Sequence, residues 1–130
     1  MKKKVLLDTS IMLSPGKFKV DIFEELKKVM NDTYDVYILD KTIDELNDLK
    51  IKAKQKDKVA ANIALALIAQ KGILVMSSSG CEGIVDDCLV KLAEEDWFVA
   101  TVDKGLKYRI LRRGIPVIEL MQKKYLRIIQ

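Results

Sequence analysis

The chain has 130 residues, of which 49% are hydrophobic and 32% charged, and this length is typical of one folded domain. It contains no histidine, which excludes Ser-His-Asp and Cys-His hydrolysis and the zinc sites that use imidazole ligands. Aromatic residues make up only 6%, which argues against the base-stacking sheet of RNA-recognition folds. The formal net charge of +4 suits a polyanionic partner. We therefore expect a single domain over residues 1–130.

The two cysteines and the short apolar runs bear on the cellular compartment. Cys81 and Cys88 do not form a CxxC pair and are too few for a disulfide framework, so we expect two reduced thiols in or near the core. The N-terminal lysines precede only three apolar residues before Asp8, far fewer than a signal peptide needs. The most apolar stretch, residues 63–69, is shorter than the roughly 20 residues that cross a bilayer. These features predict a soluble, cytoplasmic protein without a membrane partner.

Short β-type segments alternate with helical segments along the whole chain. The expected strands cover residues 5–7, 34–39, 73–76, 97–101 and 116–120, and residues 125–129 predict a short edge strand. The expected helices cover residues 22–30, 42–49, 59–69, 84–95 and 103–113. Strands that are joined by helices form a parallel sheet covered on both faces. The predicted fold is therefore a three-layer α/β/α sandwich with a central parallel sheet.

The connecting segments carry local signals of their own. Residues 14–16, Ser-Pro-Gly, predict a loop, residues 50–58 a solvated basic link, and residues 77–83 a polar loop. Thr42 and Glu45 have the spacing of a capping box at a helix start. The helix at 59–69 is apolar on nearly all sides, which predicts a central buried position, with Gly72 closing it.

The usual ligand motifs of α/β proteins are missing from the ends of the expected strands. Asp8-Thr9-Ser10 stands where a dinucleotide-binding GxGxxG would follow the first strand, and the chain has no GxxxxGK[ST]. A haloacid-type phosphatase needs a second aspartate where Ser10 stands. A response-regulator receiver needs one at the end of the third strand, where the chain has serines 77–79. These four classes are excluded.

Acidic residues occupy the strand ends instead. Asp8 follows the first strand, Glu45 the second, Asp86 and Asp87 open the helix after the third, and Asp103 follows the fourth. Each has an ordinary structural explanation, as a turn residue, half of a capping box, a first-turn acid or an N-cap. The carboxyl ends of parallel strands share one edge of the sheet, so we expect these acids to converge there. Such a group repels itself unless it holds protons or a divalent cation.

Carboxylates without histidine or cysteine nearby favour Mg²⁺ or Mn²⁺ over Zn²⁺. A carboxylate-bound metal of this kind suits phosphodiester hydrolysis, because it activates water and stabilises the leaving oxygen. We prefer Asp87 to Asp86 as the acid from its helix, because on a helical projection Asp86 lies nearer the apolar stripe of Val85, Leu89 and Leu92. Whether the site takes one ion or two is left open.

Two basic runs complete the pattern. The first, on the expected helix 103–113, comprises Lys104, Lys107, Arg109, Arg112 and Arg113. The second has a lysine at every other position from 50 to 58. For each single residue a solvated surface is an adequate explanation. Together, near an acidic pocket, they fit contacts to a nucleic-acid backbone that position it without reading sequence.

The motifs DTS at Asp8, EL at Glu45, VDDCLVKLA over 85–93 and ATVDKGLKYRILRRGIPVIEL over 100–120 together resemble a PIN domain. The resemblance covers essentially the whole chain and points to the branch of nucleases that process small-subunit ribosomal RNA, with its small VapC-like prokaryotic relatives. The DDC stretch at 86–88 and the ATVDKGLK stretch at 100–107 are its most specific parts.

The resemblance implies a Mg²⁺- or Mn²⁺-dependent endoribonuclease acting on single-stranded RNA, in ribosomal RNA processing or as a toxin of an antitoxin pair. It implies RNA, an antitoxin or pre-ribosomal proteins as partners, and often a homodimer. Matched position by position, the metal-binding and catalytic acids are Asp8, Glu45, Asp86 or Asp87, and Asp103, with Ser10 and Thr101 as supporting residues. The alternative is a non-catalytic PIN-type module that binds RNA or protein.

Overall fold

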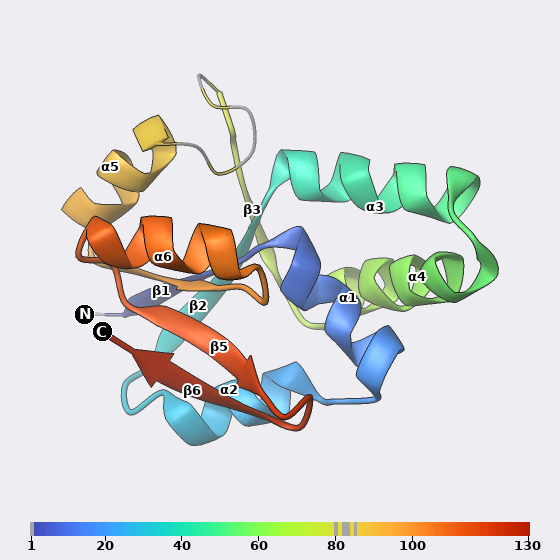
Figure 1. The fold of residues 1–130 in the computed structure, drawn as a ribbon, viewed down its shortest axis with the longest axis horizontal. Coiled ribbons are helices and arrows are strands. Elements are labelled where there is room, and N and C mark those ends of the chain that lie inside the picture. Colours follow the sequence, from blue (N-terminus) through green and yellow to red (C-terminus); the bar gives the residue numbers. More distant parts are fainter. Residues whose placement is uncertain (1, 80, 82–83, 85) are drawn as a thin grey trace.

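Six strands form one sheet between two layers of helices in a computed structural model of the chain, which describes residues 2–79, 81, 84 and 86–130 (Figure 1). The strands are β1 (Lys3–Leu7), β2 (Tyr34–Leu39), β3 (Leu74–Met76), β4 (Trp97–Ala100), β5 (Val117–Met121) and β6 (Tyr125–Ile129). The helices are α1 (Thr9–Phe18), α2 (Ile22–Val29), α3 (Asp40–Lys52), α4 (Gln55–Gln70), α5 (Asp86–Glu94) and α6 (Lys104–Arg112). The strand order is β3-β2-β1-β4-β5-β6. These bounds confirm the expected alternation of strands and helices.

The central strand β1 is buried on both faces. Val5 and Leu7 pack into the apolar cluster shared with α1, α2 and α4, whereas Leu6 packs into the opposite cluster with α5 and α6. Successive side chains of a strand point to opposite faces, so a continuous apolar run is what a doubly covered strand requires. The three-layer α/β/α sandwich predicted from the sequence is thereby confirmed.

The sheet is mixed rather than wholly parallel. β1 to β5 pair in parallel, but β6 runs antiparallel to β5. The two strands are joined by a tight turn in which Gln122 and Lys123 have φ angles of 53° and 59°, and the Lys124 N–H donates to the Met121 carbonyl at 2.9 Å. Two consecutive residues with positive φ match the twist of a hairpin. The predicted edge strand at 125–129 is present in this antiparallel form.

Helix α1 corrects the predicted loop at residues 14–16. Pro15 lies inside the helix and cannot donate to the Ile11 carbonyl, but the Ser14 Oγ does so at 2.6 Å. Gly16 lies against α4, where an added Cβ would be 2.5 Å from the Ala60 Cα. The loop prediction is wrong because a serine satisfies the carbonyl beside the proline and a glycine is needed for close helix packing.

The α3–α4 pair corrects three further expectations. α3 begins at Asp40 with no side-chain cap, so the predicted capping box at Thr42 is wrong. The predicted link is mostly helical, with only residues 53 and 54 between the two helices. α4 buries its alanine-rich face, while Val59 and Ile63 are 44% and 38% exposed, so it is not a central helix. Gly72, with φ of 64°, follows α4 as predicted.

In the part of the chain that the structure describes, every helix is too short or too polar to cross a membrane.

Candidate functional site

A pocket of about 250 Å³ opens at the carboxyl ends of β1, β2 and β4. Its lining includes three of the predicted acids, Asp8, Glu45 and Asp103, which come from segments far apart in the sequence. In the sheet β1 lies between β2 and β4. After β1 the chain forms β2 and β3 on one side of it, and then crosses to form β4 and β5 on the other side. Ligands of open α/β sheets bind at such a switch point. The expected convergence of acids therefore holds for these three residues.

Asp8 is the most enclosed acid of the pocket. Its Oδ1 accepts hydrogen bonds from the Ile11 N–H at 2.9 Å and the Ser10 hydroxyl at 2.7 Å, and its Oδ2 accepts one from the Thr101 hydroxyl. It thereby caps helix α1. Burial raises the pKa of the Asp8 carboxyl, the three hydrogen bonds oppose this, and the nearby charge of Asp103 adds to the rise.

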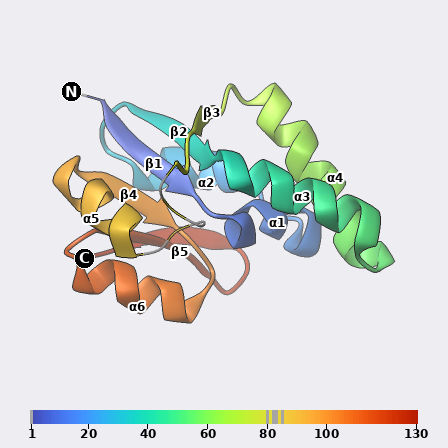
Figure 2. The ribbon, with the colours of Figure 1, turned by 90° about the horizontal axis from the view of Figure 1, so that it is seen from above.

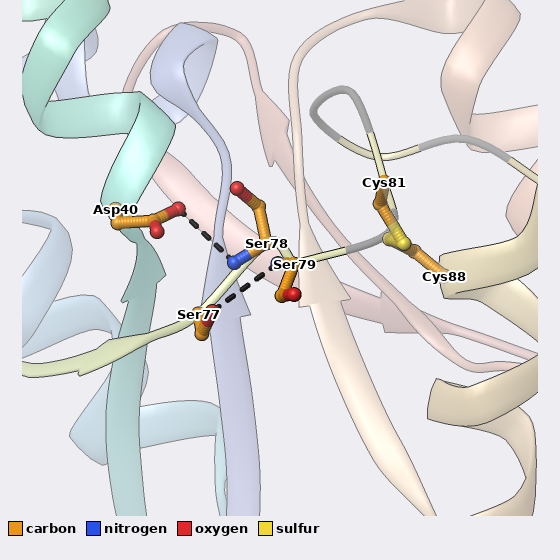
Figure 3. Close-up of a disulfide and its surroundings, with 6 residues drawn as sticks. All are labelled: Asp40, Ser77, Ser78, Ser79, Cys81 and Cys88. Carbon is orange, nitrogen blue, oxygen red and sulfur yellow. Dashed lines mark hydrogen bonds between the residues drawn. A yellow bond between two sulfur atoms is a disulfide. The ribbon is translucent and has the colours of Figure 1, made fainter.

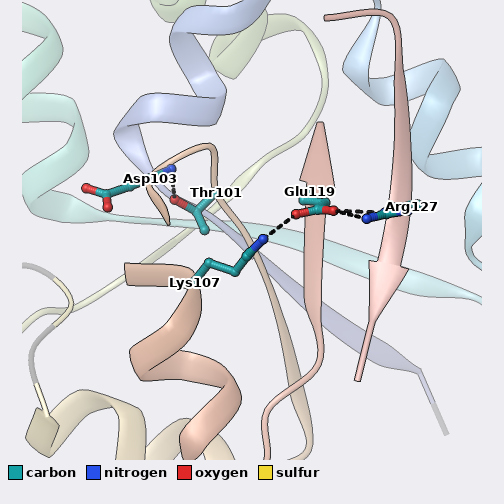
Figure 4. A network of polar contacts seen from close by, with 5 residues as sticks. All are labelled: Thr101, Asp103, Lys107, Glu119 and Arg127. Atoms are coloured by element: carbon teal, nitrogen blue, oxygen red, sulfur yellow. Dashed lines mark hydrogen bonds and ion pairs between the residues drawn. The ribbon is translucent and has the colours of Figure 1, made fainter. Parts of the chain in front are cut away.

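Ser10 and Thr101 join the two strand-to-helix junctions at the switch point. The Ser10 Oγ accepts from the Val102 N–H at 3.1 Å, and the Thr101 Oγ1 accepts from the Asp103 N–H at 3.0 Å (Figure 4). Asp103 in turn caps α6, with its Oδ1 accepting from the Leu106 N–H at 3.0 Å. The supporting residues expected from the sequence thus contact the acids directly, and their contribution to catalysis stays a prediction.

Glu45 reaches the pocket from the second turn of α3. It does not cap that helix; instead its Oε1 accepts a hydrogen bond from the Thr9 hydroxyl at 3.1 Å. The Thr9 Oγ1 also lies 3.2 Å from the hydroxyl oxygen of the buried Thr42. The sequence reasoning missed Thr9 and Thr42 as pocket residues, although Thr9 belongs to the DTS motif and Thr42 precedes Glu45 by one helical turn.

The fourth predicted acid belongs to α5, and the described part of the chain does not place it in the pocket. Asp87 is exposed and is not part of the described lining of the pocket. Asp86 opens α5, but its side chain lies outside the described part of the structure. Ile84, which precedes this helix, does line the pocket. The preference for Asp87 over Asp86 stays a prediction.

The segment between β3 and α5 is fastened at two points (Figure 3). The Asp40 Oδ1 accepts from the Ser78 N–H at 3.1 Å, and hydrogen bonding to Ser78 lowers the pKa of the Asp40 carboxyl. Cys81 and Cys88 form a disulfide, with their sulfur atoms 2.01 Å apart. The expectation of two reduced thiols is therefore wrong: although the spacing is not CxxC, the chain brings their Cα atoms within 6.1 Å.

The donor set of the pocket fits a hard cation. It offers carboxylate and hydroxyl oxygens, and among the described residues no lysine or arginine forms an ion pair with Asp8, Glu45 or Asp103. The described part of the chain has no three acids close enough to hold an ion directly. Mg²⁺ keeps several of its waters in proteins and is often bound through only one or two carboxylates, so these residues suit a hydrated ion.

The basic residues of α6 divide into two groups. The Lys107 amino group pairs with Glu119 at 2.9 Å, and Glu119 pairs with Arg127 at 2.7 Å (Figure 4). Burial opposes ionisation of Glu119, but these two cations outweigh it and lower the pKa of its carboxyl. Lys107 thus ties α6 to β5, which speaks against its predicted role in phosphate contacts. The other four, Lys104, Arg109, Arg112 and Arg113, are exposed.

Comparison with known proteins places this architecture in a family. The sequence profile described as "PIN like domain" matches residues 5–123. The chain belongs to the PIN-like domain family. This PIN-like domain is 31% identical over 130 residues to Ribonuclease VapC4 of Methanocaldococcus jannaschii, covering 96% of this chain and 95% of the relative. It is 28% identical over 121 residues to Ribonuclease VapC9 of Archaeoglobus fulgidus, covering 92% and 84%.

Among solved structures, the PIN domain endonuclease Utp24 superposes on this PIN-like domain with a TM-score of 0.74. The two sequences are 26% identical, and the match covers 96% of this chain and 90% of the other. The resemblance inferred from the DTS, DDC and ATVDKGLK motifs is confirmed.

Proposed function

We propose that this PIN-like domain is a metal-dependent endoribonuclease that hydrolyses phosphodiester bonds in single-stranded RNA, with residues 1–130 acting as one nuclease domain. Two relatives along nearly the whole chain are ribonucleases, and a structural neighbour is an endonuclease. These likenesses support nuclease chemistry. That the substrate is single-stranded RNA and that the metal is Mg²⁺ or Mn²⁺ are parts of the proposal, and the oxygen ligands of the pocket support the choice of metal.

The observation that carries the proposal is the pocket at the switch point, with Asp8, Glu45 and Asp103 in its wall. A half-buried carboxylate such as Asp8 is costly unless a cation or a proton compensates it. No basic side chain of the described residues pairs with it. Its three hydrogen bonds hold it in one orientation toward the pocket. Such an arrangement fits a carboxylate that receives a cation.

Asp8, Glu45, Asp103 and one acid of α5 would hold Mg²⁺ or Mn²⁺. When bound, the metal would supply an activated water and charge stabilisation for the leaving oxygen. The residues of the chain have three further tasks. Ser10 and Thr101 orient Asp8. The exposed cations of α6, foremost Lys104 next to Asp103, contact substrate phosphates. The apolar side chains of Leu39, Ile84 and Leu106 would line the space beside the substrate.

Two cellular roles fit this activity. The relatives named VapC suggest a toxin with an antitoxin partner, and the likeness to Utp24 suggests ribosomal RNA processing with pre-ribosomal proteins. A homodimer is compatible with either. An antitoxin gene in the neighbouring reading frame would favour the toxin role.

The alternative is a PIN-type module that binds without cutting, and one observation favours it. The described acids do not form a ready three-carboxylate metal site. Titration of Mn²⁺ into the wild-type protein, followed by calorimetry, discriminates the two proposals. An enzyme binds the ion and loses most of this binding in Asp8→Asn, whereas an inert module binds none.

Cleavage of a labelled single-stranded RNA in Mn²⁺ tests the nuclease proposal directly. We expect Asp8→Asn and Asp103→Asn each to abolish cleavage. Asp21→Asn is the matched control, because Asp21 also caps a helix, α2, through hydrogen bonds to the N–H groups of Phe23 and Glu24, but lies outside the pocket lining. Cleavage that persists in both pocket variants would refute the assignment.

A further inference from the structure

A cluster of positive charge lies at the tip of the α3–α4 hairpin. Residues 50–58 contain five lysines and one aspartate, a net charge of +4, which equals the formal net charge of the entire chain. We call these five residues, Lys50, Lys52, Lys54, Lys56 and Lys58, the lysine arm. Like the run of cations at 104–113, this cluster is a local source of positive potential.

The lysine arm lies at the far end of two helices that extend away from the sheet (Figures 1 and 2). α3 begins beside the pocket, with Thr42 and Glu45 in its first turns, and ends at Lys52. α4 returns from Gln55, and its first residues carry the remaining lysines. The arm is thus remote from the pocket and connected to it by one uninterrupted helix.

Two lysines of α3, Lys41 and Lys52, lie on the same face of the helix as the pocket acid Glu45. Lys41 precedes Glu45 by four residues and Lys52 follows it by seven, so both lie on the same face of the helix as Glu45. The rise from Glu45 to Lys52 is about 10 Å. This equals the axial rise of roughly three stacked nucleotides. One strand of this length can therefore span the distance from the pocket to the arm.

The lysines of the arm are available to a partner. Lys50, Lys52, Lys54 and Lys56 are exposed, and none of the five arm side chains forms an ion pair within the described part of the chain. The single acid in the segment, Asp57, instead faces Lys17 of α1 at 3.8 Å. The negative charge of Asp57 therefore compensates the positive charge of a lysine that lies outside the arm.

We propose that the lysine arm is a second RNA-binding surface, which holds the phosphate backbone about three or more nucleotides from the scissile bond. The inference rests on the proposed nuclease function, because it takes the pocket as the point where RNA is cut. Exposed Lys104, next to Asp103, then holds the strand on the α6 side of the pocket, so the substrate crosses the carboxyl edge of the sheet from α6 to the arm.

A polyanionic strand fits this surface better than a membrane or an acidic protein. α3 runs from the concave pocket to the tip, and a flexible strand can contact both, whereas a flat bilayer cannot enter the pocket while it contacts the tip.

Binding measurements with neutral variants test the arm. The arm variant is Lys52→Gln, Lys54→Gln and Lys56→Gln, and the control variant is Lys28→Gln, Lys123→Gln and Lys124→Gln, which removes the same charge elsewhere. Glutamine and lysine have similar helix propensities. Both sets are made in the Asp8→Asn protein so that RNA stays intact, and a 20-nucleotide single-stranded RNA is titrated at several salt concentrations.

We expect the arm variant to bind this RNA at least about tenfold more weakly, and the dependence of log K on log salt to fall by about 2, since each lost contact to a single strand is worth about 0.7. The control variant should stay within about twofold of the parent in affinity. Equal losses of affinity and salt dependence in the two variants would overturn the proposal.

Cleavage of two substrates provides the second test, in proteins that keep Asp8. The arm variant should lose far more activity on the 20-nucleotide RNA than on a dinucleotide, which is too short to reach the arm. Equal losses on both substrates would overturn the proposal. So would arm-dependent binding of phosphatidylserine vesicles without any effect on RNA. If no protein cleaves RNA in Mn²⁺ but binding still depends on the arm, the nuclease proposal fails and the RNA-binding surface stands.

Discussion

Asp8 can be replaced in two ways that separate its charge from its hydrogen bonds. Asparagine keeps an oxygen that accepts from the Ile11 N–H and the Ser10 hydroxyl, and its amide can donate to the Thr101 hydroxyl oxygen in place of the bond now donated by Thr101. Alanine removes all three contacts. Both variants should lose Mn²⁺-dependent RNA cleavage, but only alanine should damage the fold.

The magnitudes follow from these contacts. Loss of an aspartate N-cap costs about 1 kcal/mol, and leaving the buried Thr101 hydroxyl without its charged acceptor adds about 1–3 kcal/mol. We expect Asp8→Ala to lower the free energy of unfolding by about 2–4 kcal/mol in urea denaturation at pH 7. Asp8→Asn should be as stable as the wild type or more stable, because it removes a buried charge and its repulsion from Asp103.

The gain in Asp8→Asn should depend on pH. Burial raises the pKa of Asp8, so the folded protein retains its proton at pH values where the unfolded chain, with the ordinary value of 3.8, has lost it. Wild-type stability therefore falls as pH rises from about that value through the raised pKa, and the variant lacks this loss. The advantage of asparagine should be largest above the raised pKa and vanish below pH 3.8. A variant as unstable as Asp8→Ala, or an advantage that grows toward acid, would refute the reasoning.

Three further predictions concern the frame of the site. Replacing Cys81 and Cys88 together by serine should lower the free energy of unfolding by about 2 kcal/mol, since the disulfide closes a loop over a sequence separation of 7; an unchanged urea midpoint would contradict this. Gly16→Ala should cost about 1–3 kcal/mol in thermal denaturation, because its Cβ would overlap Ala60. Millimolar Mn²⁺ should raise the melting temperature of the wild type but not of Asp103→Asn; an equal rise in both would exclude Asp103 as a ligand.

The sheet and three acids of the site could be predicted because their signals are local. Apolar runs such as Val5-Leu6-Leu7 reveal strands buried on both faces, and an acid directly after such a strand must lie at its carboxyl end. Asp8 follows β1 directly and Asp103 follows β4 after two residues, so the parallel sheet brings both to one pocket.

The remaining features depend on contacts that a local pattern does not contain. Pro15 and Gly16 indicate a loop until Ser14 is seen to satisfy the Ile11 carbonyl and α4 is seen to need the space at Gly16. Val59 is exposed although it lies in an apolar stretch of α4. The apolar content of a helix does not reveal which of its faces the rest of the chain covers.

The close contact between Gly16 and Ala60 has a consequence for the proposed mode of RNA cleavage. One end of α1 carries the acid Asp8, and its other end lies directly against the helix that supports the lysine arm. If RNA binds as proposed, α1 would set the spacing between the pocket and the lysine arm. A bulkier residue at position 16 should therefore shift the cleavage position along a long RNA before it abolishes cleavage.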